Sequence, residues 1–191
     1  MDKPFVSIIV PTRNRAFFTQ NILRNFARQT YPKSRMELLI CDDSDKEGMV
    51  DEIPNKRNIK YKYLNNRNDD GLQIALSIGA KRKLLCEQAK GDIIFQMDDD
   101  DIYPRTSVSH VVASLSSKRK KVACLDIVYA VDIREQMICK LEFTAPTHIV
   151  GFKRSILKST GFNERDWISE ETSFLKECYE DWVSTLNPLK T

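Results

Sequence analysis

The chain has 191 residues, with 30 Lys and Arg against 27 Asp and Glu, and a net charge of +3. This small excess argues against a protein that an overall positive field holds to a polyanion, so we expect no nucleic-acid partner. The length fits one domain, 1–191, which can bury about two-thirds of the surface its unfolded chain exposes. No apolar run approaches the roughly 18 residues of a membrane span, and the apolar stretch after Pro4 is too short for a signal peptide, so a cytoplasmic location is expected.

The cysteines indicate neither a disulfide framework nor a metal site. Their number is odd, their spacing is wide, and no two are close enough for a metal knuckle. They are Cys41, Cys86, Cys124, Cys139 and Cys178. We expect reduced thiols, most of them buried in apolar surroundings.

Strands and helices alternate in the first half of the chain. Residues 5–10 form a short apolar run that Pro11 is expected to stop, and 37–41 form a second such run. Apolar residues at helical spacing predict helices at 15–29 and 72–90, with Gly91 as the C-terminal cap of the second. A weaker strand is expected at 59–64.

The second half continues the alternation. A strand at 93–97 is followed by a helix after Pro104, and residues 122–131 and 136–143 are expected to form two strands joined by a polar turn. A short helix should end near Gly161, and a last helix should start at Ser169. Alternating strands and helices predict an α/β fold with a central, mostly parallel sheet flanked by helices.

Three of the apolar strands end abruptly in polar residues. The segments that follow them are Pro11-Thr12-Arg13-Asn14-Arg15, Asp42-Asp43 and Asp98-Asp99-Asp100-Asp101. Ligands of open parallel sheets bind outside the carboxyl ends of the strands. We therefore expect these three segments to meet at one edge of the sheet.

The run of four aspartates is the sharpest local feature. Adjacent carboxylates repel one another, and a divalent cation such as Mn²⁺ or Mg²⁺ removes that repulsion. Alternate residues can face the same way, so Asp98 and Asp100 are the candidate metal ligands. The alternative is a solvated acidic turn. A calcium loop is disfavoured because the turn has no Gly and no closing Glu.

Several segments resemble family-two glycosyltransferases of the GT-A fold. Val6-Ser7-Ile8-Ile9-Val10-Pro11-Thr12-Arg13-Asn14-Arg15 is similar to the opening strand of that family, and Leu39-Ile40-Cys41-Asp42-Asp43-Ser44 to its second strand. Gly79-Ala80-Lys81-Arg82 and Ala89-Lys90-Gly91-Asp92 resemble the helix that leads to its DXD motif, for which Asp98–Asp101 stands at the family spacing. Gly161-Phe162-Asn163-Glu164 and Ser169-Glu170-Glu171 resemble its late catalytic segment.

The resemblance implies an inverting, metal-dependent transfer of a sugar from a nucleotide-diphosphate sugar to a hydroxyl of a glycan or another acceptor. UDP-glucose or a related UDP-sugar is the expected donor. About 1–101 would form the nucleotide-sugar-binding half and about 102–191 the acceptor and catalytic half.

The family roles carry over residue by residue. Pro11, Thr12 and Arg13 would border the nucleotide, Asp42 or Asp43 would accept hydrogen bonds from the base or ribose, and Arg82, with Lys81 beside it, would face the diphosphate. Asp99 would contact the ribose or the metal shell, Asp100 would be the main metal ligand, and Glu171 or Glu170 would be the general base.

The sequence departs from the family pattern at three points. Lys83 stands where an Asn often follows the Arg, and the acidic pair is Glu-Glu in place of Glu-Asp, which leaves open which glutamate is the base. No Gln-x-x-Arg-Trp motif occurs, so we expect a non-processive enzyme.

Other functions and other roles remain open at this point. An aspartyl phosphatase would use Asp98 as nucleophile and Asp100 as acid/base. A non-catalytic nucleotide- or glycan-binding module would bind a donor without turnover. Glu170 and Glu171 could merely favour a helix N-terminus. His148 could be a third metal ligand or an acceptor contact, and Trp167 could stack on an acceptor sugar.

Overall fold

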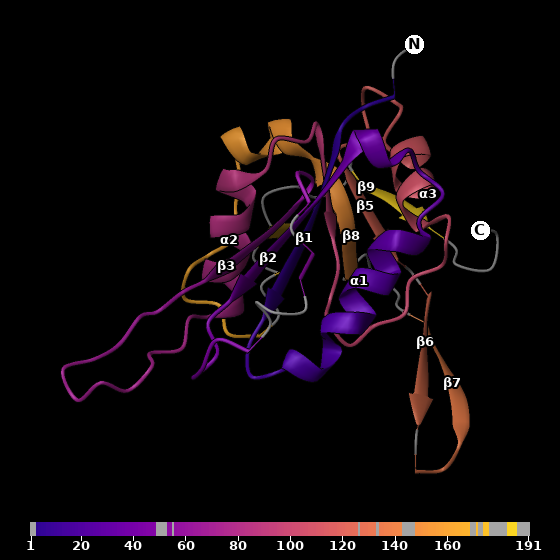
Figure 1. The fold of residues 1–191 in the computed structure, drawn as a ribbon. Coiled ribbons are helices and arrows are strands. Elements are labelled where there is room, and N and C mark those ends of the chain that lie inside the picture. The colour runs from indigo at the N-terminus through magenta and orange to yellow at the C-terminus, as the bar shows by residue number, and fades with distance from the viewer. Residues whose placement is uncertain are drawn as a thin grey trace.

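The computed structural model describes residues 3–48, 53–54, 56–125, 127–132, 134–142, 148–168, 171, 174–175 and 183–186. Within these residues seven strands form one sheet in the order β3-β2-β1-β4-β8-β5-β9 (Figure 1). The strands are β1 (Val6–Thr12), β2 (Met36–Asp42), β3 (Ile59–Tyr63), β4 (Ile93–Gln96), β5 (Val122–Leu125), β8 (His148–Lys153) and β9 (Val183–Leu186).

The sheet is mostly parallel, as the sequence predicts. β1 pairs in parallel with β2 and β4, and β2 with β3, while β8 runs antiparallel between β4 and β5. The strands β1, β2 and β4 are buried along their whole lengths, which explains their continuous apolar sequences. The carboxyl ends of β1, β2, β3, β4 and β5 therefore share one edge, at the bottom of Figure 1.

Helices cover both faces of the sheet. The helices α1 (Thr19–Arg28) and α3 (Ser107–Ser114) bury Ile22, Phe26 and Val111 against one face. The helix α2 (Ile78–Gln88) covers the other face, where a second core contains Phe152, Phe162 and Phe174. Short 3-10 helices lie at η1 (Ala16–Phe18), η2 (Lys33–Arg35) and η3 (Arg154–Lys158).

A two-stranded ribbon projects from the site edge of the sheet. It consists of β6 (Ile127–Asp132) and β7 (Met137–Glu142), which pair antiparallel and extend below the body of the molecule in Figure 1. The sequence predicts one strand over 122–131, but β5 ends at Leu125 inside the sheet and β6 belongs to the ribbon. The return strand β8 is absent from the predicted elements.

Two further predictions near α2 are wrong. The helix begins after Ser77, whose hydroxyl accepts a hydrogen bond from the Ala80 N–H, so residues 72–77 belong to the preceding loop. The helix ends at Gln88, and Gly91 is not its cap. A Cβ at Gly91 would lie 2.4 Å from the backbone nitrogen of Ser7, so glycine is needed there for close approach to β1.

In the part of the chain that the structure describes, no helix has both the length and the apolar character that crossing a membrane requires. The predicted last helix lies largely outside the described residues. Of its members, Glu171, Phe174 and Leu175 are described, and all three have helical backbone.

Candidate functional site

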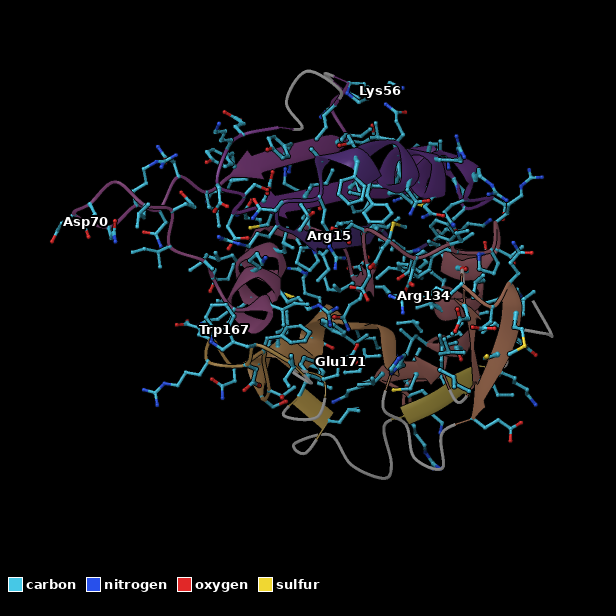
Figure 2. The ribbon with its side chains drawn as sticks, turned by 90° about the horizontal axis from the view of Figure 1, so that it is seen from below. Arg15, Lys56, Asp70, Arg134, Trp167 and Glu171 are labelled. Atoms are coloured by element: carbon cyan, nitrogen blue, oxygen red, sulfur yellow. The ribbon has the colours of Figure 1, made fainter. Side chains whose placement is uncertain are left out.

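The polar segments after β1, β2 and β4 meet at one edge of the sheet. Figure 2 views this edge from below, with Arg15 and Glu171 on opposite sides of its central region and Asp70 on an arm that extends away from the body. The segments are more than 80 residues apart at the extremes, and the parallel register of β1 with its two neighbours brings them together.

Asp99 links the end of β1 to the end of β4. Its side chain is buried, and its two oxygens accept hydrogen bonds from Thr12 Oγ1 at 2.6 Å and from Arg15 Nη1 at 2.8 Å. The hydrogen bond with Asp99 is the largest cause of the raised pKa of Arg15. The same Nη1 donates to Asp100 Oδ2, also at 2.8 Å. Asp99 is thus engaged within the protein, and Asp100 faces the solvent beside it.

Amide and phenol groups hold the backbone of the aspartate run. Asn21 Nδ2 donates to the carbonyl oxygens of Asp99 and Asp101, and Asn25 Nδ2 donates to the carbonyl oxygen of Asp101. The hydroxyl of Tyr103 accepts from the Asp98 N–H at 2.9 Å. Burial, together with the charges of Asp98 and Asp100, raises the pKa of Asp101. The turn is therefore fixed by α1 and by Tyr103.

The two aspartates after β2 have different surroundings. Asp42 accepts hydrogen bonds from the Ser44 N–H and hydroxyl in its own segment and from the Tyr61 hydroxyl of β3. Asp43 is fully buried, and its carboxylate accepts from Lys81 Nζ at 2.7 Å and from the Leu76 N–H at 2.6 Å. Of the two carboxylates, Asp43 is therefore the one in contact with residues that border the pocket.

Arg82 connects the aspartate run to the late segment. Its guanidinium is buried, with Nη2 2.9 Å from Asp98 Oδ1 and Nη1 3.4 Å from Glu171 Oε1, and it packs over the ring of Phe162. Lys81, one residue earlier, points to the β1 side, where it also donates to the Thr12 carbonyl. Lys81 therefore contacts the segments after β1 and β2, whereas Arg82 contacts the aspartate run and the late segment.

A pocket of about 390 Å³ opens among these groups. Its lining residues are Pro11, Thr12, Arg13, Arg15, Ile78, Lys81, Asp98, Asp99 and Asp100. Asp98 and Asp100 are the carboxylates with exposed side chains, 46% and 44%, whereas that of Asp99 is 4% exposed. A cationic wall and two accessible carboxylates suit an anion that arrives with a divalent metal.

The donor set fits a metal that shares its coordination with a ligand. Among the described residues no three His, Cys, Asp or Glu side chains cluster closely enough to hold an ion by themselves. Mg²⁺ is commonly bound by one or two carboxylates together with substrate phosphates, and Asp98 and Asp100 can supply that number. Each of the two currently pairs with an arginine, Arg82 or Arg15.

Of the other residues named from the sequence, His148 and Trp167 are described, and Glu170 lies outside the described residues. His148 begins β8 at the site edge, and its charge lowers the pKa of Asp101, opposing the larger effects that raise it. Trp167 is 60% exposed at the same edge.

Sequence reasoning missed the residues that support the site. Arg15 lies just beyond the residues assigned to the nucleotide, and Tyr103 lies just after the aspartate run. Asn21 and Asn25 are one turn apart on the expected helix, so their amides lie on one face of it. This spacing, in a helix that follows β1, was a signal that the two residues support the site.

Comparison with known proteins agrees with this geometry. The family model for glycosyl transferase family 2 matches residues 7–169. The poly(ribitol-phosphate) beta-N-acetylglucosaminyltransferase TarS of Staphylococcus aureus is 27% identical over 119 residues, which are 61% of this chain and 20% of that protein. The glycosyltransferase AglE of Haloferax volcanii is 35% identical over 97 residues, 51% of this chain and 31% of that protein. This chain thus matches only about a fifth to a third of the length of these relatives.

Solved structures share the fold. Residues 1–349 of Staphylococcus aureus TarS superpose with a TM-score of 0.69 at 19% identity, over 95% of this chain and 58% of that one. The mannosyltransferase PcManGT of Pyrobaculum calidifontis, in complex with GDP-Man and Mn²⁺, gives 0.73 at 17% identity, over 97% and 55%. The fold is therefore that of the GT-A glycosyltransferases. With a family match over most of its length, the chain belongs to glycosyl transferase family 2.

Proposed function

We propose that this chain transfers a sugar from a nucleotide-diphosphate sugar to an acceptor hydroxyl, with inversion at the anomeric carbon. The observation that carries the proposal is the position of Arg82, which contacts Asp98 of the aspartate run and Glu171 of the late segment with one guanidinium. A donor-side carboxylate and a candidate base thus lie within the reach of a single side chain. Family membership favours this function over an aspartyl phosphatase.

The donor is held in the pocket between β1 and the aspartate run. Thr12 and Arg13 border the nucleotide. Asp43 is buried and acts on the donor through Arg13 and Lys81, which it holds at the pocket wall. Lys81 and Arg15 supply positive charge for the diphosphate. The structural neighbours were crystallised with different nucleotides, UDP or UDP-GlcNAc in TarS and GDP-Man in PcManGT. For this chain we propose a UDP-sugar.

Asp100, with Asp98, would hold Mn²⁺ or Mg²⁺ together with the donor. A divalent cation there stabilises the negative charge that develops on the leaving nucleotide diphosphate. Arg15, which pairs with both Asp99 and Asp100, would lie beside the diphosphate and would keep Asp99 as a partner if Asp100 held the metal.

Glu171 acts as the general base. Its carboxylate takes the proton of the acceptor hydroxyl as the new bond forms from that oxygen to the anomeric carbon and the bond to the diphosphate breaks. Arg82 orients the carboxylate, and Trp167 offers an exposed ring to the acceptor sugar. The single displacement needs no covalent intermediate and inverts the anomeric centre.

Calorimetric titration with UDP, GDP and dTDP, each with and without Mn²⁺, tests the donor site. We expect metal-dependent binding of UDP, and its loss in Asp100→Asn. Asp70→Asn is the matched control, because Asp70 lies on the projecting arm, distant from Arg15 (Figure 2). Equal UDP affinity of Asp100→Asn and the native chain would exclude this metal site.

A further inference from the structure

A groove lies at the end of the sheet opposite to the donor pocket. Its cavity volume is about 1480 Å³, and it is bordered by the starts of β1 and β4, the end of β8 and η3, at the top of Figure 1. Its charged lining residues are Lys3, Lys83, Glu87, Asp92, Lys153, Arg154 and Lys158. Positive side chains thus outnumber negative ones in the lining by five to two.

A second group of positive side chains borders this groove. The Lys153 N–H donates to the Lys121 carbonyl at 2.8 Å, and Lys153 Nζ donates to the Ser117 carbonyl at 2.6 Å. The run Lys118-Arg119-Lys120-Lys121 therefore adjoins the groove wall. The small net charge of the whole chain does not reveal this local concentration of positive side chains.

The positive charges of the groove are poorly compensated. Burial lowers the pKa of Lys153, and the nearby charge of Lys121 adds a smaller effect in the same direction. Asp92 uses its carboxylate to accept from the Phe5 N–H, and Lys83 pairs with Glu164. Within the described residues, no carboxylate forms an ion pair with Lys158, Lys118 or Arg119, and all three side chains are exposed.

One wall of the groove, at Asn163, packs on α2 and leads along the chain toward the catalytic edge. Asn163 lines the groove. Its backbone oxygen packs on Gly79 of α2, where an added Cβ would lie 2.1 Å from that oxygen. From Asn163 the chain continues past Trp167 to Glu171. The seven residues of β1 span about 23 Å, so only an extended ligand could occupy the groove and reach the base.

We propose that this groove binds a phosphate-bearing polymer, one part of which is the sugar acceptor at the catalytic edge. The inference rests on the proposed function and gives the acceptor a chemical class. Concavity favours a chain over a flat lipid surface. Phe162 is the aromatic residue of the lining and is buried, so the lining offers no exposed ring on which nucleic-acid bases could stack.

Binding of long-chain inorganic polyphosphate, measured by calorimetry at several salt concentrations, tests the proposal. The triple variant Lys118→Glu/Arg119→Glu/Lys158→Glu changes one exposed side chain of the groove lining and two of the adjoining basic run. The control Lys56→Glu/Arg57→Glu/Lys62→Glu changes the net charge by the same amount. Its residues lie in β3 or just before it, and β3 is an edge strand of the sheet, separated from β8 by β2, β1 and β4. We expect the groove variant to bind at least tenfold more weakly, with a salt slope lower by about 2, and the control to stay within twofold.

Three results would overturn the proposal: equal weakening in both variants, no weakening in the groove variant, or tighter binding of single-stranded DNA or phosphatidylglycerol vesicles than of polyphosphate. Tripolyphosphate should bind more weakly than the long chain. UDP binding in the presence of Mn²⁺ is measured on the same samples and should not change in the groove variant. Absence of UDP binding in the native chain would count against the donor site, whereas the polyphosphate result judges the groove alone.

Discussion

The guanidinium of Arg15 lies 2.8 Å from the exposed carboxylate of Asp100, at the position where a donor-bound metal is proposed to sit. The ion pair joins the segment after β1 to the segment after β4. A protein cation and a metal ion therefore compete for the same oxygen.

Replacing Arg15 should strengthen the binding of metal alone. In Arg15→Gln we expect Mn²⁺ affinity without nucleotide to rise by about fivefold, because a half-exposed ion pair contributes up to about 1 kcal/mol. Calorimetry or the paramagnetic resonance signal of free Mn²⁺ measures this. Arg24→Gln, an exposed arginine of α1, is the control. Unchanged Mn²⁺ affinity in Arg15→Gln would show that the pair does not compete.

Glu171→Gln should separate catalysis from donor binding. The amide cannot accept the acceptor proton, so we expect turnover to fall by about a hundredfold or more, while UDP affinity stays within twofold. Sugar transfer or donor hydrolysis gives the first quantity and calorimetry the second. Glu135→Gln, on the ribbon turn, should leave both unchanged. A larger loss in Glu170→Gln than in Glu171→Gln would assign the base to the preceding residue.

Gly79→Ala should disturb the late segment through α2. The new Cβ would meet the backbone oxygen of Asn163, and the Gly79 N–H also donates to the Asp166 carbonyl, so the turn leading to Glu171 must move. We expect a loss of about 1–3 kcal/mol in unfolding free energy and a fall in kcat of about tenfold or more. Gly161→Ala, where a Cβ would meet nothing within 4 Å, is the matched control. Equal behaviour of the two variants would contradict the close packing at Gly79.

The pH dependence of stability should report on Glu37. Burial alone would raise the pKa of this carboxyl, but hydrogen bonds from the Lys90 N–H, the Ser7 hydroxyl and Lys60 bring it below the ordinary 4.5. The ionised form therefore stabilises the fold above about pH 4.5, and this contribution is lost as pH falls through the lower folded pKa.

Urea unfolding between pH 7 and pH 3 compares Glu37→Gln with the native chain. At pH 7 the variant should be less stable by about 1–3 kcal/mol, because Lys60 and one N–H lose a charged acceptor. The difference should shrink below about pH 4.5. Glu47→Gln, an exposed position, should follow the native curve. A difference that stays constant with pH would contradict the ionised state of Glu37 in the folded protein.

Thiol labelling should distinguish buried from accessible cysteines. Burial raises the pKa of Cys41 and of Cys86 to about 12, so neither forms thiolate near neutral pH, whereas Cys139 on the ribbon is partly exposed. Iodoacetamide at pH 8 followed by peptide mapping should modify Cys139 before Cys41 and Cys86, which should react only in denaturant. Rapid labelling of Cys86 in the folded chain would contradict its buried position.

The ends of β2 and β4 were predictable because each depends on local sequence, whereas β1 continues to Thr12, through the Pro11 that is expected to stop it. The change from an apolar run to charged residues at Asp42 and at Asp98 marks the carboxyl end of a buried strand, and parallel pairing then brings such ends together. The parallel sheet and the edge that carries the polar residues follow from that pattern alone.

The remainder depends on contacts between distant residues. The strand β8 contains Gly151, which a hydropathy pattern does not favour in a strand. A Cβ there would lie 2.7 Å from Val111 Cγ1, so tertiary packing of α3 determines that residue. Likewise the bonds of Asp99 to Thr12 and Arg15 join residues 84 to 87 apart, and no local pattern contains them.

The position of β8 between β4 and β5 has a consequence for biosynthesis. On the ribosome, β4 emerges more than fifty residues before the strand that covers its second edge. At ordinary translation rates this leaves the backbone of Ile94 and Phe95 open on that side for a few to about ten seconds. Nascent chains of this protein should therefore depend on chaperones during that interval, although the residues that hold the aspartate turn, from Thr12 to Tyr103, have been made by then.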